Sequence, residues 1–418
     1  MISAIEARRY RCLRSVSQTL SPFQILVGPN ASGKTTFLDV LALVRDVLEA
    51  GPLEAVARRT DNFADLLWGR MGSDFELAVE ASLPDDIAQR LNGRRYTLLR
   101  YELKMGLHLA TAEVGILWEN VTLLSQTRCH LPDPNLFPEI LPAEAELATR
   151  RARPGSRTIV RKAPDRDDHF YSEVTSEAGK GWMPSFRLGH GKSALANLPD
   201  DETRFPATTW FRSMVRDGVQ SLVLNSQAMR RPSPPGQGRS FRPDGSNLPW
   251  VIERLKSDHP DRFAQWLQHV QTALPDLIGI ETVERPEDRH RYLMVRFANG
   301  ETVPSWGVSD GTLRLLALTL PAYLPDIGGI YLIEEPENGI HPQAVETVYQ
   351  ALSSVYNAQL LVASHSPVLL ANARLREVLC FGRTRDGATA IVRGDQHPRL
   401  KEWHDSANIG LLLASGVL

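Results

Sequence analysis

The stretch FQILVGPNASGKTTFLDVLALVRDVL, residues 23–48, decides the fold. Its first five residues, FQILV, have the apolar character and length of a short buried strand. A glycine-rich turn follows. Phe37, Leu41, Val44 and Leu48 then recur at spacings that place them on one face of a helix. The order of strand, glycine-rich loop and helix predicts an α/β protein.

The loop itself, GPNASGKT, matches the phosphate-binding pattern GxxxxGK[ST]. Backbone N–H groups of such a loop, together with the start of the helix behind it, can hold phosphate oxygens. Lys34 would reach the β- and γ-phosphates of a nucleotide, and the Thr35 hydroxyl would bind Mg²⁺. The alternative is a chance glycine-rich turn. The predicted nucleotide-binding residues are Gly28, Pro29, Asn30, Ala31, Ser32, Gly33, Lys34, Thr35 and Thr36.

A second apolar strand, in YLIEEPENGIHP at residues 331–342, ends on two adjacent carboxylates. Like charges at the end of a buried strand are costly unless a cation or a proton-transfer role accompanies them. We therefore expect Glu334 to hold Mg²⁺ and Glu335 to polarise the attacking water. The alternative is a carboxylate pair at a solvated strand end.

Strand geometry limits how these two carboxylates can act together, because adjacent side chains on a regular strand point to opposite faces. Both can serve one site only if the strand ends near Glu334 and the backbone turns before Pro336. Pro336 itself predicts an extended backbone for Glu335.

Two further segments carry candidate site residues. In LLVASHSP, residues 360–367, a third apolar strand ends on His365, which we expect to contact the γ-phosphate and the attacking water. A structural histidine is the alternative there. Ser309, Asp310 and Gly311 stand at the start of an apolar helical run and predict a second anion site. An ordinary helix cap is the alternative for this segment.

The remaining patterns predict how the chain is organised. Strand-like stretches over 76–125 predict an antiparallel sheet, and the strands at 329–333 and 359–364, joined by a helix, predict parallel pairing. Asn299-Gly300 predicts a hairpin turn. We expect an α/β fold with a mainly parallel core sheet, an antiparallel β lobe and an inserted irregular α/β lobe. The expected domains are 1–125, 126–243 for the insert, and 244–418.

Bulk composition narrows the possible partners and compartments. A formal net charge of -2 over 418 residues gives no global attraction to nucleic acid or to an anionic membrane. Three widely spaced cysteines favour the reducing cytoplasm. The start of the chain has no apolar region typical of a signal peptide, and no stretch is apolar enough over its length to be a membrane span.

Two basic segments could contact DNA phosphates: residues 150–166, and the group Arg230, Arg231, Arg239 and Arg242. Solvated, mobile loops are the favoured alternative, because no aromatic residues are interleaved with these charges to stack on bases.

The order of phosphate-binding loop, S-D-G-T, E-E-P-E-N and S-H-S-P resembles the ABC-type ATPase heads of the SMC, RecF and OLD-like families. It is most similar to the prokaryotic "AAA family" ATPases grouped with OLD proteins. S-D-G-T resembles their signature motif, EEPENGIHP their Walker B and D-loop, and SHSP their switch-histidine loop. The N-terminal EARRYRCL is similar to a strand that places Arg11 on nucleotide phosphates. Gln227 is the candidate metal-contacting glutamine of the Q-loop. Thr312 departs from the signature of transporters.

The resemblance implies Mg²⁺-dependent ATP hydrolysis by a homodimer. Two heads would close head-to-tail around two ATP molecules, with Ser309, Asp310 and Gly311 of one head meeting the nucleotide of the other. No Asp-x-Asp set of a Toprim nuclease follows His365. We therefore expect a head that switches a separately encoded effector, by analogy a nuclease in anti-phage defence.

Two other functions stay open at this point. The first is a RecF-like, ATP-dependent DNA-binding and repair clamp. The second is the ATPase subunit of an ABC transporter, which the long spacing between loop and signature, S-D-G-T and the Glu-Glu pair all disfavour.

Overall fold

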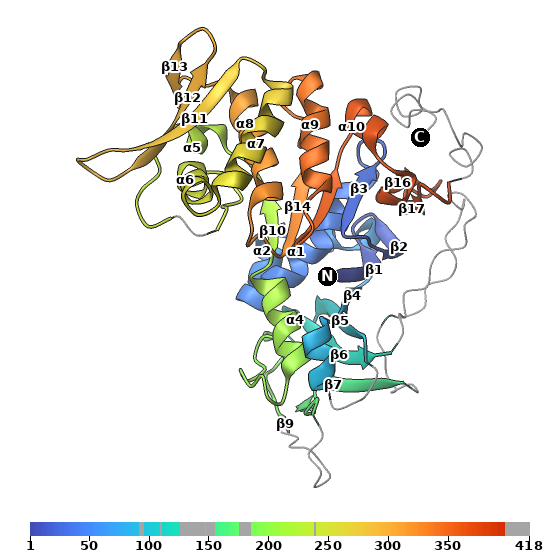
Figure 1. The fold of residues 1–418 in the computed structure, drawn as a ribbon. Helices are drawn as coiled ribbons and strands as arrows, with labels where there is room; N and C mark the ends of the chain where they lie inside the picture. Colours follow the sequence, from blue (N-terminus) through green and yellow to red (C-terminus); the bar gives the residue numbers. More distant parts are fainter. Residues whose placement is uncertain are drawn as a thin grey trace. The chain divides into compact units, whose positions relative to one another are not determined.

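The computed structural model describes residues 1–91, 96–108, 111–125, 147, 155–174, 185–237 and 240–397. Figure 1 draws their helices and strands. The contacts among them define two compact units. Unit 1 comprises Met1–Ser21, Gly28–Val219 and Leu379–Pro398, and unit 2 comprises Pro22–Val27 and Gln220–Val378. The domain boundaries expected at 125/126 and 243/244 stay a prediction.

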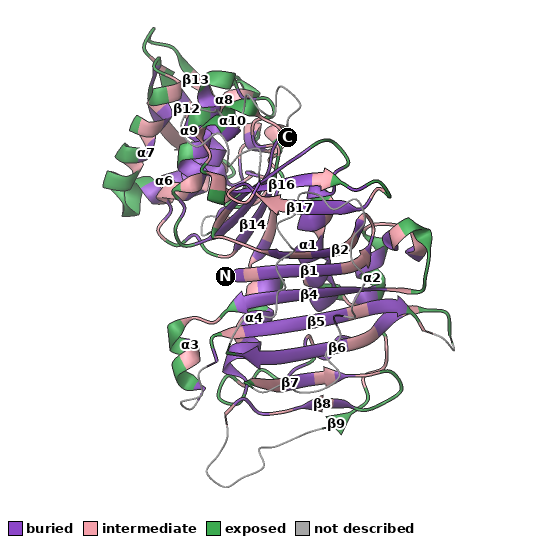
Figure 2. Cartoon of the chain, turned by 90° about the vertical axis from the view of Figure 1, so that its right-hand side faces the viewer, coloured by how far each residue is buried: buried purple, intermediate pink, exposed green. Residues whose placement is uncertain are grey.

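Unit 1 contains an antiparallel sheet, whose described strands run in the order β2-β1-β4-β5-β6-β7-β8-β9. Figure 2 shows its central strands mostly buried. The pairing of β4 with β5 and of β5 with β6 confirms the antiparallel sheet predicted over 76–125. The strands are β1 (Ile2–Tyr10), β2 (Leu13–Thr19), β4 (Asp74–Ser82), β5 (Leu98–Leu107), β6 (Val114–Leu124), β7 (Ser156–Lys162), β8 (Asp168–Phe170) and β9 (Ser185–Phe186).

One face of this sheet buries charge. The Arg100 guanidinium donates to Glu6 at 3.0 Å, to Glu80 at 2.9 Å and to Glu102 at 2.8 Å. All four side chains are at most 4% exposed. Removing the arginine would leave buried carboxylates without their cation, which is strongly destabilising. The cluster therefore fixes how β1, β4 and β5 lie side by side.

The sheet continues into the segment expected to be an irregular insert. β7 pairs with β6, β8 with β7, and β9 with β8, all antiparallel. The interpretation of residues 150–166 as a solvated loop is therefore wrong for the part that forms β7. The edge of β6 requires a hydrogen-bonding partner, and the side chains of β7 have partners of their own. Arg161 lies over the Trp118 ring at 5.4 Å, and Lys162 binds Asp168 at 3.0 Å. Residues 150–154 lie outside the described part of the chain.

The helix after the phosphate-binding loop, α1, packs inside unit 1. The face predicted from Phe37, Leu41, Val44 and Leu48 is buried, which confirms the helix and its orientation. The other elements of unit 1 are α2 (Pro52–Ala57), η1 (Phe63–Leu66), η2 (Trp68–Arg70), α3 (Asp85–Arg90), α4 (Pro206–Arg216), and a hairpin of β16 (Val378–Arg383) and β17 (Thr389–Arg393); α1 itself is Lys34–Ala50.

Unit 2 contains parallel strands, and the sheet strands that belong to this unit run in the order β10-β14-β15-β3. They are β10 (Val219–Leu222), β14 (Ile330–Glu334), β15 (Gln359–Ala363) and β3 (Phe23–Val27). β14 pairs with β15 in parallel, as the sequence predicted, and β15 pairs with β3 in parallel as well. The carboxyl ends of parallel strands share one edge, and ligands of open α/β sheets bind there.

Helices and a small second sheet complete unit 2. The hairpin predicted at Asn299-Gly300 is confirmed, since β12 and β13 pair antiparallel around it. The helices are α5 (Ser226–Arg230), α6 (Leu248–Asp258), α7 (Pro260–Ala273), α8 (Asp310–Thr319), η3 (Leu320–Tyr323), α9 (Pro342–Ser353), α10 (Pro367–Asn372) and η4 (Leu375–Glu377). The small sheet has β11 (Leu277–Glu284), β12 (Arg291–Phe297) and β13 (Thr302–Pro304).

Candidate active site

The phosphate-binding loop begins at Gly28, directly after the last residue of β3, and curls tightly within unit 1. Ala31 and Gly33 both have positive φ, at 60° and 103°. A Cβ on Gly33 would lie 2.2 Å from the Thr389 Oγ1, so only glycine fits there. The same Thr389 hydroxyl donates to the Ser32 carbonyl at 2.8 Å. The β16–β17 hairpin thus supports the loop from behind.

The start of α1 fits an anion. Gly33 is its N-cap and offers no side chain to cap the helix. Lys34 donates to the carbonyls of Gly28 at 2.8 Å and Pro29 at 3.0 Å. The Ser32 hydroxyl is buried and has no hydrogen-bond partner in the described residues. An uncapped helix start, a lysine and a buried hydroxyl are the donors that phosphate oxygens need. The residues present therefore fit the phosphates of ATP.

Arg11 lies beside α1. It follows β1 with a φ of 49°, and its guanidinium is 3.4 Å from the carboxylate of Asp39, one turn after Thr35. Arg59 binds the same carboxylate at 2.7 Å, and the Tyr10 hydroxyl donates to it at 2.5 Å. Burial, reinforced by Asp39, raises the pKa of Tyr10 well above its usual range. Arg11 is thus held next to the helix that starts the loop site, while its contact with phosphate stays a prediction.

The strand with the two carboxylates ends where a site shared by both carboxylates requires it to end. β14 stops at Glu334, which is exposed, and the chain turns at Glu335. The expected extended backbone of Glu335 is wrong, because its φ is 46° and therefore left-handed. The Glu335 amide donates to the Ala363 carbonyl at 2.8 Å, and its carbonyl accepts from the Asn338 amide at 3.0 Å. These two backbone bonds outweigh the local preference that Pro336 imposes.

The left-handed turn brings Glu335 to His365. The His365 Nε2 lies 4.0 Å from a Glu335 carboxylate oxygen, and the Asn338 side-chain amide donates to the other oxygen. His365 stands two residues after the end of β15, at the same sheet edge. Unit 2 therefore gathers Glu334, Glu335 and His365 where parallel strands end, as the sequence predicted.

Two residues that sequence reasoning missed join this group. The Glu337 carboxylate accepts from the Ser364 hydroxyl at 2.7 Å and from the His365 backbone amide at 3.1 Å. Ser364 is fully buried. The signal that could have found them is a third carboxylate in the turn after the Glu pair, facing a serine beside the histidine.

Ser309 caps α8. Its hydroxyl accepts from the Thr312 amide at 3.2 Å and lies 2.9 Å from the Thr312 hydroxyl. The helix-cap alternative is therefore confirmed for Ser309. Its action on a nucleotide stays a prediction.

The residues after Ser309 are held from two sides. Arg230 of α5 binds the Asp310 carboxylate at 2.8 Å and the Val308 carbonyl at 3.0 Å. A Cβ on Gly311 would lie 2.7 Å from the carbonyl of Gly339, so the start of α8 packs directly on the turn after Glu335. Arg230 is therefore a structural contact rather than a solvated basic residue. Arg239 lies outside the described residues.

Gln227 is exposed on α5, which follows β10, the sheet neighbour of β14. Its contact with a metal stays a prediction. The described residues hold no group of three or more His, Cys, Asp or Glu side chains that could bind a metal ion. Mg²⁺ does not need one, because it is commonly held by one or two protein oxygens together with substrate phosphates and water.

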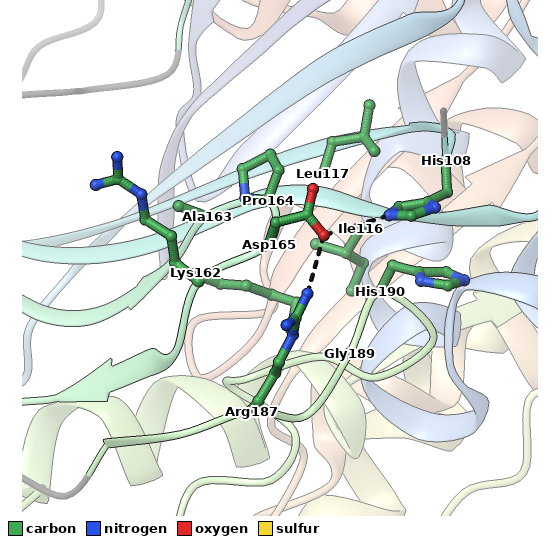
Figure 3. Close-up of a pocket in the computed structure, with 11 residues that line it drawn as sticks. His108, Ile116, Leu117, Lys162, Ala163, Pro164, Asp165, Arg187, Gly189 and His190 are labelled. Carbon is green, nitrogen blue, oxygen red and sulfur yellow. Dashed lines mark hydrogen bonds and ion pairs between the residues drawn. The ribbon is translucent and has the colours of Figure 1, made fainter. Parts of the chain in front are cut away.

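A cavity of about 230 Å³ lies in unit 1 beside the antiparallel sheet (Figure 3). One lining carboxylate, that of Asp165, pairs with two basic side chains of the lining, and it lies 3.9 Å from the His108 Nε2. Asp165 binds Arg187 at 2.9 Å, and the rings of His108 and His190 stack at 4.4 Å. None of the predicted nucleotide-binding residues is among those that line it.

A comparison with known protein families shows which family this chain belongs to. Residues 23–113 and 147–371, more than half of the chain, match the family described as "AAA domain, putative AbiEii toxin, Type IV TA system". The chain belongs to this family. It is therefore a P-loop ATPase head of the ABC type, and this confirms the resemblance seen in the sequence. No helix among the described residues of this AAA-domain protein is long and apolar enough to cross a membrane.

Curated relatives of this AAA-domain protein include DNA mismatch repair proteins MutS. The MutS of Rhodopseudomonas palustris strain HaA2 is 24% identical over 266 residues, 59% of this chain and 27% of that protein. The MutS of Nitrobacter winogradskyi is 28% identical over 258 residues, 57% of this chain and 27% of that protein. The chain thus aligns with about a quarter of the length of these relatives.

Solved structures similar to this AAA-domain protein include heads of SMC proteins. The SMC head bound to the C-winged helix domain of ScpA has a TM-score of 0.49 and 15% identity, covering 94% of this chain and 96% of that one. The SMC head domain from Thermotoga maritima has a TM-score of 0.42 and 12% identity, covering 94% and 98%.

Proposed function

We propose that this ATPase head binds ATP with Mg²⁺ and hydrolyses it, with Glu335 as the general base. The observation that carries the proposal is the left-handed turn at Glu335, which sets this carboxylate 4.0 Å from His365 at the carboxyl edge of the parallel sheet. Glu335 takes the proton of the attacking water, and His365 contacts that water and the γ-phosphate.

Other residues hold the substrate. The loop from Gly28 to Thr36, with Lys34 and Arg11, binds the phosphates of ATP. Thr35, Glu334 and Gln227 would hold Mg²⁺, directly or through water. When bound, Mg²⁺ neutralises charge on the β- and γ-phosphates. The fit of Ser32, Gly33 and Lys34 to an anion supports this assignment.

The active form in this proposal is a homodimer closed head-to-tail around two ATP molecules. Ser309, Asp310 and Gly311 of one head meet the γ-phosphate bound by the other. The exposure of the Asp310 side chain, which is 55% at the start of α8, supports this arrangement.

We further propose that this cycle switches a separately encoded effector, a nuclease in anti-phage defence. The family description, which names a putative toxin of a toxin–antitoxin system, supports a defence role. A second candidate is an ATP-dependent DNA-binding clamp in DNA repair, which the similarity to MutS favours.

The ATPase rate with and without duplex DNA, at two salt concentrations, separates the two candidates. The effector switch predicts a rate that duplex DNA leaves unchanged and a neighbouring gene product that co-purifies with the head. Strong stimulation by DNA alone that weakens with salt would favour the clamp instead. No Mg²⁺-dependent hydrolysis under any of these conditions would contradict the proposed enzyme.

A further inference from the structure

Glu337 stands between the two groups assigned to hydrolysis. It lies two residues after Glu335 in the turn that follows β14, and its side chain reaches the segment that follows β15. There its Oε1 accepts from the Ser364 hydroxyl at 2.7 Å and from the His365 amide at 3.1 Å. A single carboxylate oxygen therefore joins the turn after β14 to Ser364 and His365, which lie 27 and 28 residues further along the chain.

The tie extends into the next turn. The Ser364 hydroxyl, which donates to Glu337, also accepts from the Ser366 amide at 3.0 Å. Ser366 in turn caps α10 by accepting from the Leu369 amide at 3.3 Å. Besides the bond from the Ser364 amide to the Leu26 carbonyl at 3.1 Å, the path of the chain through Ser364, His365 and Ser366 thus depends on the Glu337 carboxylate. Charge-assisted bonds of this kind are stronger than those between neutral groups.

The same turn also holds Glu335. Asn338 donates to the Glu335 carboxylate through its side chain and to the Glu335 carbonyl through its amide, the latter at 3.0 Å. The other oxygen of Glu337, Oε2, is buried and has no hydrogen-bond partner in the described residues. A buried acceptor without a donor is costly to a fold.

We propose that Glu337 is a positioning residue, which sets His365 at its working distance from Glu335 through the Ser364 hydroxyl and the His365 amide. The proposal rests on the function proposed above. It assigns Glu337 no contact with ATP and no proton transfer. Its role is to hold the histidine loop against the turn that carries the base.

The test compares Glu337→Ala, which removes the acceptor, with Glu337→Gln, which keeps an acceptor oxygen on a side chain of the same length. Glu346→Ala, an exposed residue on α9, is the matched control. We expect Glu337→Ala to lower kcat by roughly 10- to 100-fold with KM for ATP unchanged, because positioning acts on the chemical step. Glu337→Gln restores kcat to within about threefold of wild type.

Hydrogen exchange of the peptide covering 364–372, measured without ATP, provides a readout that needs no hydrolysis. If Glu337→Ala removes the hydrogen bonds from Ser364 and His365, amide exchange in this peptide should be at least about tenfold faster than in wild type. The control Glu346→Ala should exchange at the wild-type rate. A wild type that binds ATP without hydrolysing it would contradict the proposed function. The exchange measurement would still test whether Glu337 holds the segment through its hydrogen bonds to Ser364 and His365.

Three results would overturn the proposal. The first is a wild-type kcat in Glu337→Ala. The second is a rise in KM that accounts for the whole loss of kcat/KM. The third is unchanged exchange over 364–372. Failure of Glu337→Gln to restore both readouts would also count against it.

Discussion

Glu335 adopts a left-handed backbone conformation, which costs a residue other than glycine about 1–2 kcal/mol. The cost is tolerated because two backbone hydrogen bonds fix the turn, one to Ala363 and one from Asn338. On a continuing strand, Glu335 would point to the face opposite Glu334. The strained turn is thus the residue-level feature that lets both carboxylates serve one edge of the sheet.

Lys34 closes the loop through two carbonyls and supplies its positive charge. We expect Lys34→Ala to weaken ATP binding by roughly 10- to 100-fold, the size of one or two charge-assisted hydrogen bonds. Titration with a fluorescent ATP analogue measures the Kd. Lys192→Ala, an exposed lysine of the same unit, is the control and should bind like wild type. Equal affinity in both variants would remove the phosphate-binding role.

Cys380 is buried in β16, and burial raises the pKa of its thiol to about 12. Because thiolate is the reactive form, very little of this thiol is reactive at pH 8. Maleimide labelling read by mass spectrometry should therefore modify Cys12, which is half-buried, well before Cys380. In urea the two should react alike.

The raised pKa of Cys380 makes the stability of the folded chain depend on pH. Folding raises this pKa, so the stability that the neutral thiol contributes is present below the unfolded value of about 8.5 and is lost as the pH rises toward 12. Rapid labelling of Cys380 in the folded chain at pH 8 would contradict its burial.

At the scale of the element, the loop depends on the hairpin behind it. Gly33→Ala combines a φ of 103° with a Cβ 2.2 Å from the Thr389 Oγ1. We expect it to lower the free energy of unfolding by about 1–3 kcal/mol and to weaken ATP binding as well. Gly191→Ala is the control, since its Cβ would meet no heavy atom within 4 Å. Urea denaturation gives the free energies, and equal values for both variants would contradict the assigned packing.

Elements with a strong local pattern could be predicted from the sequence. The strand-loop-helix unit at 23–50, the parallel strands β14 and β15, and the antiparallel strands over 76–125 all formed as expected, because period and composition are local signals. The strand β7 could not, because its arginines and lysine resemble a loop until Trp118 and Asp168 are placed beside them.

The candidate site also contains residues that the sequence could predict and residues that it could not. The positions of Glu334, Glu335 and His365 could be predicted because each lies at or just after the end of an apolar strand. Glu337 could not, because its partners come from a loop 27 or 28 residues away, and no local pattern carries that pairing. The φ of Glu335 also escaped prediction, since long-range backbone hydrogen bonds overrode the preference that precedes proline.

At the scale of the whole molecule, the proposed cycle depends on two copies. The residues assigned to hydrolysis lie at the edge of the parallel sheet of unit 2. The signature segment at the start of α8 is assigned to the nucleotide of a second head. ATP binding and dimer closure are then one event, so that a variant which binds ATP without hydrolysing it should accumulate as a dimer.

Glu335→Gln tests the central claim most directly. Size-exclusion chromatography with light scattering, with and without ATP and Mg²⁺, is run beside an ATPase assay, with Glu346→Gln as the control. The account predicts unimpaired ATP binding, hydrolysis reduced by at least about 100-fold, and a dimer that persists only with ATP. Wild-type turnover by Glu335→Gln, or a monomer in saturating ATP, would contradict it.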